Sequence, residues 1–177
     1  TAQSLFKLTT SNSEANINFN ISGSTNNFFG ITGGANFFWN TGSTERMRLD
    51  SSGNLGLGVT PSAWGGTYKA EQLGAKAALS YTSLGNGYTL LTHNGYDSGA
   101  GAWKYLANGY ASQYTQVDGT HQWTNAASGT AGNAITFTQA MTLDASGNLG
   151  IGTSSPGEKL EVAGNIKVTD RKSTRLN

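Results

Sequence analysis

Carboxylate and imidazole side chains are the groups in this sequence that could carry out hydrolysis. Enzymes that cleave polysaccharides use two carboxylates, one as a general acid and the other as a base or nucleophile. The acids are scattered, and Glu14, Glu71 and Asp97, which belong to no turn motif, show no spacing that would pair them. His93 and His121 are isolated, cysteine is absent, and no Gly-x-Ser-x-Gly elbow occurs. We therefore expect no catalytic residue, no metal site and no cofactor, so the chain is not predicted to be an enzyme.

Aromatic residues between positions 103 and 123 offer a different chemistry, the binding of sugars. Asn108-Gly109 and Asp118-Gly119 are two-residue hairpin signals. Strands built on both turns would place Trp103 opposite Tyr114, Tyr114 opposite Trp123, and Gln116 opposite His121. Because strand neighbours alternate between faces, one face of this three-stranded meander would carry six rings. They are Trp103, Tyr105, Tyr110, Tyr114, His121 and Trp123.

Such an aromatic face has two interpretations. Rings offer an apolar surface to the C–H groups of a sugar and a polar tip to its hydroxyls, which indicates a glycan-binding platform. Its residues would be Trp103, Tyr105, Tyr114, His121 and Trp123. Aromatic pairs across strands also stabilise sheets by up to about 1 kcal/mol each, so the face could instead pack against another sheet or chain. We favour packing, and expect receptor contacts in loops such as 93–101, whose glycines and serine suit an exposed tip.

An internal repeat supplies the elements that would hold these residues. The segment Met47–Pro61 (MRLDSSGNLGLGVTP) recurs as Met141–Pro156 (MTLDASGNLGIGTSSP), at an offset of 94 residues. Over the twelve aligned positions of 47–58, three differ. Each copy contains Gly-x-Gly, but neither has the Lys-Ser/Thr pair or the following helix of a phosphate-binding loop.

Each copy of the repeat predicts a hairpin. Asp50 and Asp144 would accept hydrogen bonds from turn amides, while Gly53 and Gly147 would take the left-handed conformation of a bulge. The glycines that alternate with leucine after each turn would let another backbone come close, which suits a packed, multi-chain stalk.

Patterning along the rest of the chain predicts short strands. Apolar and polar residues alternate in 16–22 and 134–138, and 158–168 reads as two strands around Ala163-Gly164-Asn165. Only 68–79 has the composition of a helix, and Gly74 interrupts it. We therefore predict an all-β fold of short-stranded hairpin repeats.

Composition indicates that this fold is completed by partners. Gly, Ser, Thr and Asn number 82 of the 177 residues, whereas Leu, Ile, Val and Phe number 32. Such a chain is short of the apolar surface needed to fold alone. Its net charge of +1 gives no field for nucleic acid, and no apolar run is long enough for membrane insertion. Burial between chains, as in an intertwined oligomer, is the arrangement that these numbers favour.

The patterns divide the chain into four segments. Residues 1–62 form an N-terminal β segment that ends in the first GNLGLG hairpin, and 63–94 form a connecting segment. Residues 95–169 hold the aromatic meander, the GNLGIG hairpin and a KLEVAGNIKV hairpin. The last segment, 170–177 (DRKSTRLN), back-translates into a common short-read sequencing adapter, so we exclude it from fold reasoning as an artefact. Because the chain begins at Thr1 rather than at methionine, we expect a fragment.

Several of these motifs resemble repeats of bacteriophage tail fibre proteins. They are the paired GNLGLG and GNLGIG turns, SSPGEKLEVAGNI (154–166) and HQWTNAASGTAGNAITFTQAMTLDASGNLGIGT (121–153). The resemblance covers 45–62 and 95–168. In that family such repeats often lie upstream of a self-cleaving chaperone domain that trimerises the fibre, but no chaperone sequence occurs here.

The resemblance implies an elongated homotrimer in the tail fibre of a virion, synthesised in the host cytoplasm. Its partner would be a glycan or protein receptor on the host surface, bound by multivalent display of weak sites. Two alternatives stay open. A bacterial surface adhesin could use related turns, and a tailspike that depolymerises polysaccharide would need the carboxylate pair that is not found.

Overall fold

The computed structural model of the chain describes residues 14–19, 27–32, 34 and 36–167. Every regular element in these ranges is a strand, and they contain no helix that could cross a membrane. The strands are β1 (Glu14–Phe19), β2 (Asn27–Thr32), β3 (Phe37–Thr41), β4 (Thr44–Leu49), β5 (Leu55–Leu57), β6 (Tyr68–Leu73), β7 (Ala77–Thr82), β8 (Tyr88–His93), β9 (Gly95–Asp97), β10 (Trp103–Tyr105), β11 (Gly109–Val117), β12 (Thr120–Gly129), β13 (Thr138–Leu143), β14 (Leu149–Ile151) and β15 (Leu160–Val162).

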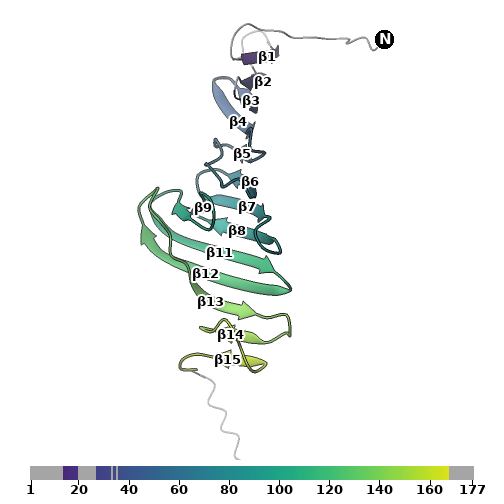
Figure 1. Ribbon diagram of the computed structural model, residues 1–177. Coiled ribbons are helices and arrows are strands. Elements are labelled where there is room, and N and C mark those ends of the chain that lie inside the picture. The colour runs from purple at the N-terminus through teal and green to yellow at the C-terminus, as the bar shows by residue number, and fades with distance from the viewer. Residues whose placement is uncertain (1–13, 20–26, 33, 35, 168–177) are drawn as a thin grey trace, which may run out of the picture.

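One long sheet dominates the described residues. Thirteen strands follow one another in chain order, and only β9 and β10 leave the ladder to form a separate two-stranded ribbon. All pairs are antiparallel except β5 with β6 and β14 with β15. Figure 1 shows the strands stacked one below another in a narrow column that widens at β11 and β12. The all-β prediction is therefore confirmed, and 63–94, expected as a connection, supplies β6, β7 and β8 to the sheet.

Both predicted turns form, and they form alike. The carboxylate of Asp50 accepts from the amides of Ser52 (2.9 Å) and Asn54 (2.8 Å), and Gly53 has φ +81°. In the second copy, the same hydrogen bonds run from Ser146 and Asn148 to Asp144, and Gly147 has φ +73°. The hydrogen bond from the backbone amide of Asn148 is the main cause that lowers the pKa of the Asp144 carboxyl, and the hydrogen bond from Ser146 adds to it.

The glycines after each turn do bring a second backbone close, and that backbone belongs to the chain itself. A Cβ on Gly56 would lie 2.1 Å from the carbonyl oxygen of Val59, and one on Gly150 would lie 2.6 Å from that of Thr153. In each copy a proline-containing loop folds over the glycine and leads into a parallel strand, β6 or β15. These contacts are intrachain, so the glycines are no evidence for a multi-chain stalk.

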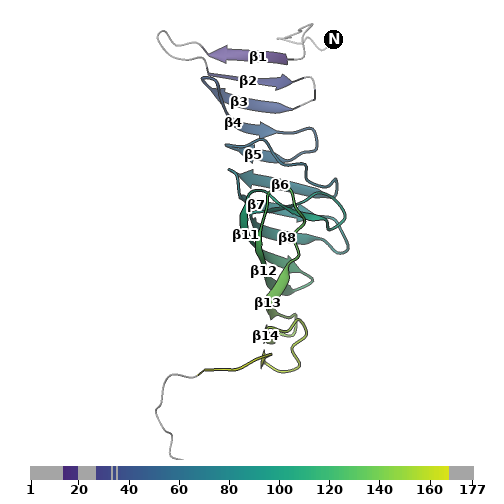
Figure 2. The same ribbon diagram turned by 90° about the vertical axis from the view of Figure 1, so that its left-hand side faces the viewer.

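The sheet has two different faces in its middle. On the covered face, alternate residues of β6, β7 and β8 are buried, and on the open face their neighbours are partly or fully exposed. The covered face is overlaid by loop 58–67 and by the excursion 94–108 that contains β9 and β10. Figure 1 shows β9 beside β7 and β8, and Figure 2 shows β1 to β8 stacked in order from the side. The core therefore lies between the sheet and its own loops.

Aromatic rings fill this core. Trp64, Tyr68 and Trp103 meet in tilted or edge-to-face contacts with centroids 5.9 to 6.2 Å apart. Trp103 also contacts Phe137, at 5.7 Å. Burial, together with the neighbouring carboxylate of Asp97, raises the pKa of Tyr68 above its ordinary value. The excursion thus supplies rings to the covered face, where the buried sheet residues include the small side chains of Ala70 and Ala78.

The predicted Asn108-Gly109 hairpin does not form. β10 pairs with β9, so Trp103 lies opposite Asp97, and Gly109 pairs with Gly129. The cause is the fully buried side chain of Asn94, which accepts from the amide of Ala107 (2.8 Å) and donates to the carbonyl of Tyr110 (3.0 Å). This long-range clamp satisfies the polar groups that a local turn would have paired.

Replacing Gly147 by valine should lower the free energy of unfolding by about 1 to 3 kcal/mol, because a β-branched residue is strained at positive φ. Gly53→Val should act in the same way, and chemical denaturation followed by circular dichroism measures both. Gly66→Val is the control, since Gly66 is exposed with open space around its Cβ position. Unchanged stability of both turn variants would show that the turns do not depend on these conformations.

Replacing Trp103 by alanine should cost about 3 to 5 kcal/mol, since it removes a ring that three other aromatic residues contact in the core. Tyr110→Ala is the matched control, because Tyr110 is 72% exposed and should lose little. Thermal melts of the two variants give the comparison. Equal melting temperatures would place Trp103 outside the core.

Candidate functional site

Three of the predicted ring residues meet on the open face of β11 and β12. Tyr114 pairs with Trp123 across the strands, with centroids 5.1 Å apart, and Gln116 pairs with His121, as the Asp118-Gly119 turn predicts. The His121 ring stacks on Tyr114 (6.0 Å) and lies 6.5 Å from Trp123. The Tyr114 hydroxyl and Nδ1 of His121 are 2.5 Å apart, within hydrogen-bond distance. The site is a cluster of stacked and tilted rings that contains one hydroxyl–imidazole pair.

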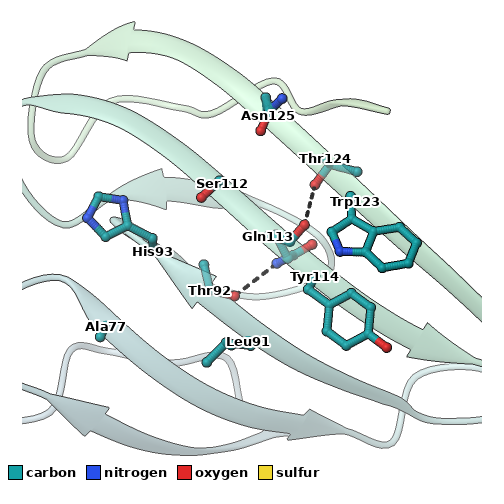
Figure 3. Close-up of a pocket in the computed structure, with 10 residues that line it drawn as sticks. All are labelled: Ala77, Leu91, Thr92, His93, Ser112, Gln113, Tyr114, Trp123, Thr124 and Asn125. Atoms are coloured by element: carbon teal, nitrogen blue, oxygen red, sulfur yellow. Dashed lines mark hydrogen bonds between the residues drawn. The ribbon is translucent and has the colours of Figure 1, made fainter. Parts of the chain in front are cut away.

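A shallow pocket of about 490 Å³ adjoins this group. Figure 3 shows Tyr114 and Trp123 projecting side by side from neighbouring strands, with Leu91 of β8 beside them and His93 further along the same strand. Below the rings, the side chain of Gln113 donates to Thr92 (3.1 Å). Leu91, which lines the pocket, is 57% exposed. In the isolated chain this leucine therefore lies exposed beside two large, partly buried rings.

The pocket is one section of a much longer feature, which we call the apolar stripe. In the long sheet, each strand from β2 to β15 places one open-face residue opposite that of the next strand, which gives a single row of twelve residues. Eleven of the twelve are apolar. The stripe consists of Ile31, Phe37, Leu49, Leu55, Glu71, Leu79, Leu91, Tyr114, Trp123, Met141, Ile151 and Val162.

Exposure is concentrated along this stripe and the open-face rows that flank it. Eleven large hydrophobic side chains are exposed in the described part of the chain. Nine of them lie on the open face, namely Ile31, Trp39, Leu49, Leu73, Leu79, Tyr81, Leu91, Ile151 and Leu160. Single exposed hydrophobic residues are normal on a protein surface, but a contiguous apolar patch of this length marks an interaction site.

The other two residues of the predicted glycan platform lie elsewhere. Trp103 belongs to the core of the covered face, and Tyr105 is buried with its hydroxyl donating to the carbonyl of Ala127 (2.5 Å). A Cβ on Gly129 would lie 2.2 Å from the Tyr105 ring, so that glycine is required by the packing. The five predicted glycan residues are thus divided between two faces, and no single platform contains them all.

The residues that hydrolysis would need are also separated. Glu71 lies in the apolar stripe, whereas Asp97 is fully buried and accepts from the amide of Gly99 (2.6 Å) within the excursion. Within the described residues, no three acidic, histidine or cysteine side chains gather as they would around a metal ion. In the loop 93–101, expected as an exposed tip, only His93, Ala100 and Gly101 are exposed, because β9 is packed into the core.

The sequence reasoning missed Leu79, Leu91 and their neighbours in the stripe. The alternation of apolar and polar residues within each strand is visible in the sequence. Which residues lie opposite one another on neighbouring strands depends on the number of residues in every connecting turn. The chain matches no known family model and no curated protein. The geometry of its own residues, and above all the apolar stripe, therefore carries the argument for function.

Proposed function

We propose that this chain is a structural and adhesive segment of a phage tail fibre, in which the apolar stripes of identical chains pack together. Three copies around one axis would bury the three stripes and leave the covered faces and their loops outward. Such a segment acts as a rigid support that repeats a receptor-binding surface around the fibre, and it has no catalytic role.

The apolar stripe is the observation that carries this proposal. Nine large side chains, each about half exposed, present on the order of 900 Å² if a fully exposed side chain of this size offers about 200 Å². A stable protein interface needs about 800 Å² from each partner. The open face thus supplies the area of a standard interface before any smaller residue is counted.

The form of the stripe favours identical chains as its partners. It runs along the ladder from β2 to β15, with a single acid at Glu71, and a partner must match that length and that lack of charge. A second and third copy of the same sheet satisfy both conditions. The composition agrees, because a chain with few aliphatic residues gains its missing burial from its copies.

The same stripe favours the packing interpretation of Tyr114, His121 and Trp123. They lie within the surface that the copies would cover, so we assign them to assembly, and receptor contacts to the outward face. A bacterial surface adhesin with this architecture would pack in the same way. Virion genes beside the complete gene would favour the fibre, and a secretion signal at its start would favour the adhesin.

Replacing Leu91 by glutamate should convert the oligomer into monomers, because three carboxylates would have to be buried together near the axis. Sedimentation velocity of the full chain measures this. Ala131→Glu is the matched control, since Ala131 is exposed on the loop before β13 and its charge would stay in water. A monomeric wild type, or a Leu91→Glu variant that still sediments as the wild-type oligomer, would overturn the proposed assembly.

A further inference from the structure

A second pocket, of about 280 Å³, opens on the covered face between the excursion and strands β8, β11 and β12. We infer that it binds an uncharged sugar unit of a surface glycan, an inference that rests on the proposed adhesive function and names its ligand. Its chemistry comes from Tyr88, Gly101, Trp103, Gln113, Thr115 and Gln122.

The position of this pocket suits a receptor site. Gln113, Thr115 and Gln122 alternate with Tyr114 and Trp123 along their strands, so they project from the opposite side of the sheet. Copies that pack through the stripe would therefore leave this pocket facing solvent. Gly101, which lines the pocket, lies at the exposed tip of the excursion. A Cβ on Gly101 would have open space around it.

The rings of the pocket are held in place before any ligand binds. Trp103 is fixed by edge contacts with Trp64, Tyr68 and Phe137, and Tyr88 packs against the same core cluster. A ring that is already immobilised gives contact area to the C–H face of a sugar at little cost in entropy.

The polar groups of the pocket match sugar hydroxyls. Gln113 is oriented by two bonds, since its Nε2 donates to Thr92 (3.1 Å) and its Oε1 accepts from the Thr115 hydroxyl (3.2 Å). The side-chain amide of Gln122 hydrogen-bonds to no other described residue, which leaves its two N–H groups and its oxygen for a ligand. Amides and hydroxyls beside fixed rings are the groups that orient a small polar ligand in a pocket.

Charge and size narrow the ligand class. None of the nine lining residues is ionisable as an acid or a base near neutral pH, so a carboxylate or phosphate would be desolvated without a counter-charge. The volume is near the lower end of ligand sites, which is about 300 Å³, so the pocket suits one or two sugar units. A neutral hexose or N-acetylhexosamine within a longer glycan meets these conditions.

Isothermal titration of the oligomeric full chain with lactose, maltotriose and chitotriose tests the inference, with sialyllactose as the charged counterpart of lactose. At least one neutral probe should bind with a dissociation constant in the range of about 1 mM. Gln122→Ala should weaken that binding about tenfold, because a hydrogen-bonding partner is lost. Tyr88→Phe, which keeps the ring, should weaken it less. Gln116→Ala, on the opposite face of β11, should bind as the wild type does.

Three results would overturn the site: no binding of any neutral probe, at least tenfold tighter binding of sialyllactose than of lactose, or unchanged binding by Gln122→Ala. Sedimentation of the same samples keeps this test separate from the proposed assembly. An oligomer that binds no sugar overturns the pocket alone, whereas a monomer that binds sugar overturns the assembly alone.

Discussion

The register between neighbouring strands determines which residues reach each face of the long sheet. Side chains alternate across a sheet, so a slip of one residue in any pairing would send all later apolar residues to the other face. Bulges keep the register where the chain carries an extra residue. Between β12 and β13, Trp123 pairs with Met141 and Thr124 with Gln139, so Ala140 is absorbed and the stripe continues. A similar irregularity lies between β3 and β4, next to Trp39.

The duplicated motif serves both faces of the sheet at once. In each copy the residues Leu-Gly-Leu or Leu-Gly-Ile give their apolar side chains to the open face and their glycine to the covered face. The missing side chain of Gly56 or Gly150 lets the proline loop lie directly on the strand. Gln72 and Glu161 then fix that loop by accepting from the amides of Ser62 and Gly157. One short sequence thus builds the stripe, covers the opposite face and starts the parallel strand that carries the ladder onward.

Several local features of the fold could be predicted from the sequence, but the KLEVAGNIKV hairpin does not form. Residues 163–167 contain no strand, and β15 pairs in parallel with β14 instead. The Asp50 and Asp144 turns and the Asp118-Gly119 hairpin form as expected, because each is determined by residues within a few positions of one another. The pairing of Tyr114 with Trp123 follows from the same hairpin. Asn108-Gly109 fails because Asn94, more than ten residues away, binds the backbone on both sides of it. The helical composition of 68–79 is overridden as well, since Gly74 at φ +58° turns it into the β6–β7 hairpin.

The functional surfaces could not be predicted because they join residues whose relation is set by the whole ladder. Leu91 and Tyr114 are neighbours only because the excursion removes β9 and β10 from the sheet and lets β8 pair with β11. The departure of β9 and β10 from the sheet also brings Trp103 to the covered face and leaves Tyr114 on the open face. The rings therefore serve two purposes, burial within the chain and contact between chains, in place of the single platform that their spacing suggested.

Distances between copies show whether the apolar stripe lies at the axis of an oligomer. The chain has no cysteine, so Leu91→Cys introduces one unique site for a spin label at the middle of the stripe. Pulsed electron paramagnetic resonance should then give a single distance between copies of roughly 20 Å or less, about the width of two packed sheets. The same label at Ala131→Cys, on the covered side, should give a clearly longer distance. A Leu91 distance equal to or longer than the Ala131 distance would contradict assembly through the stripe.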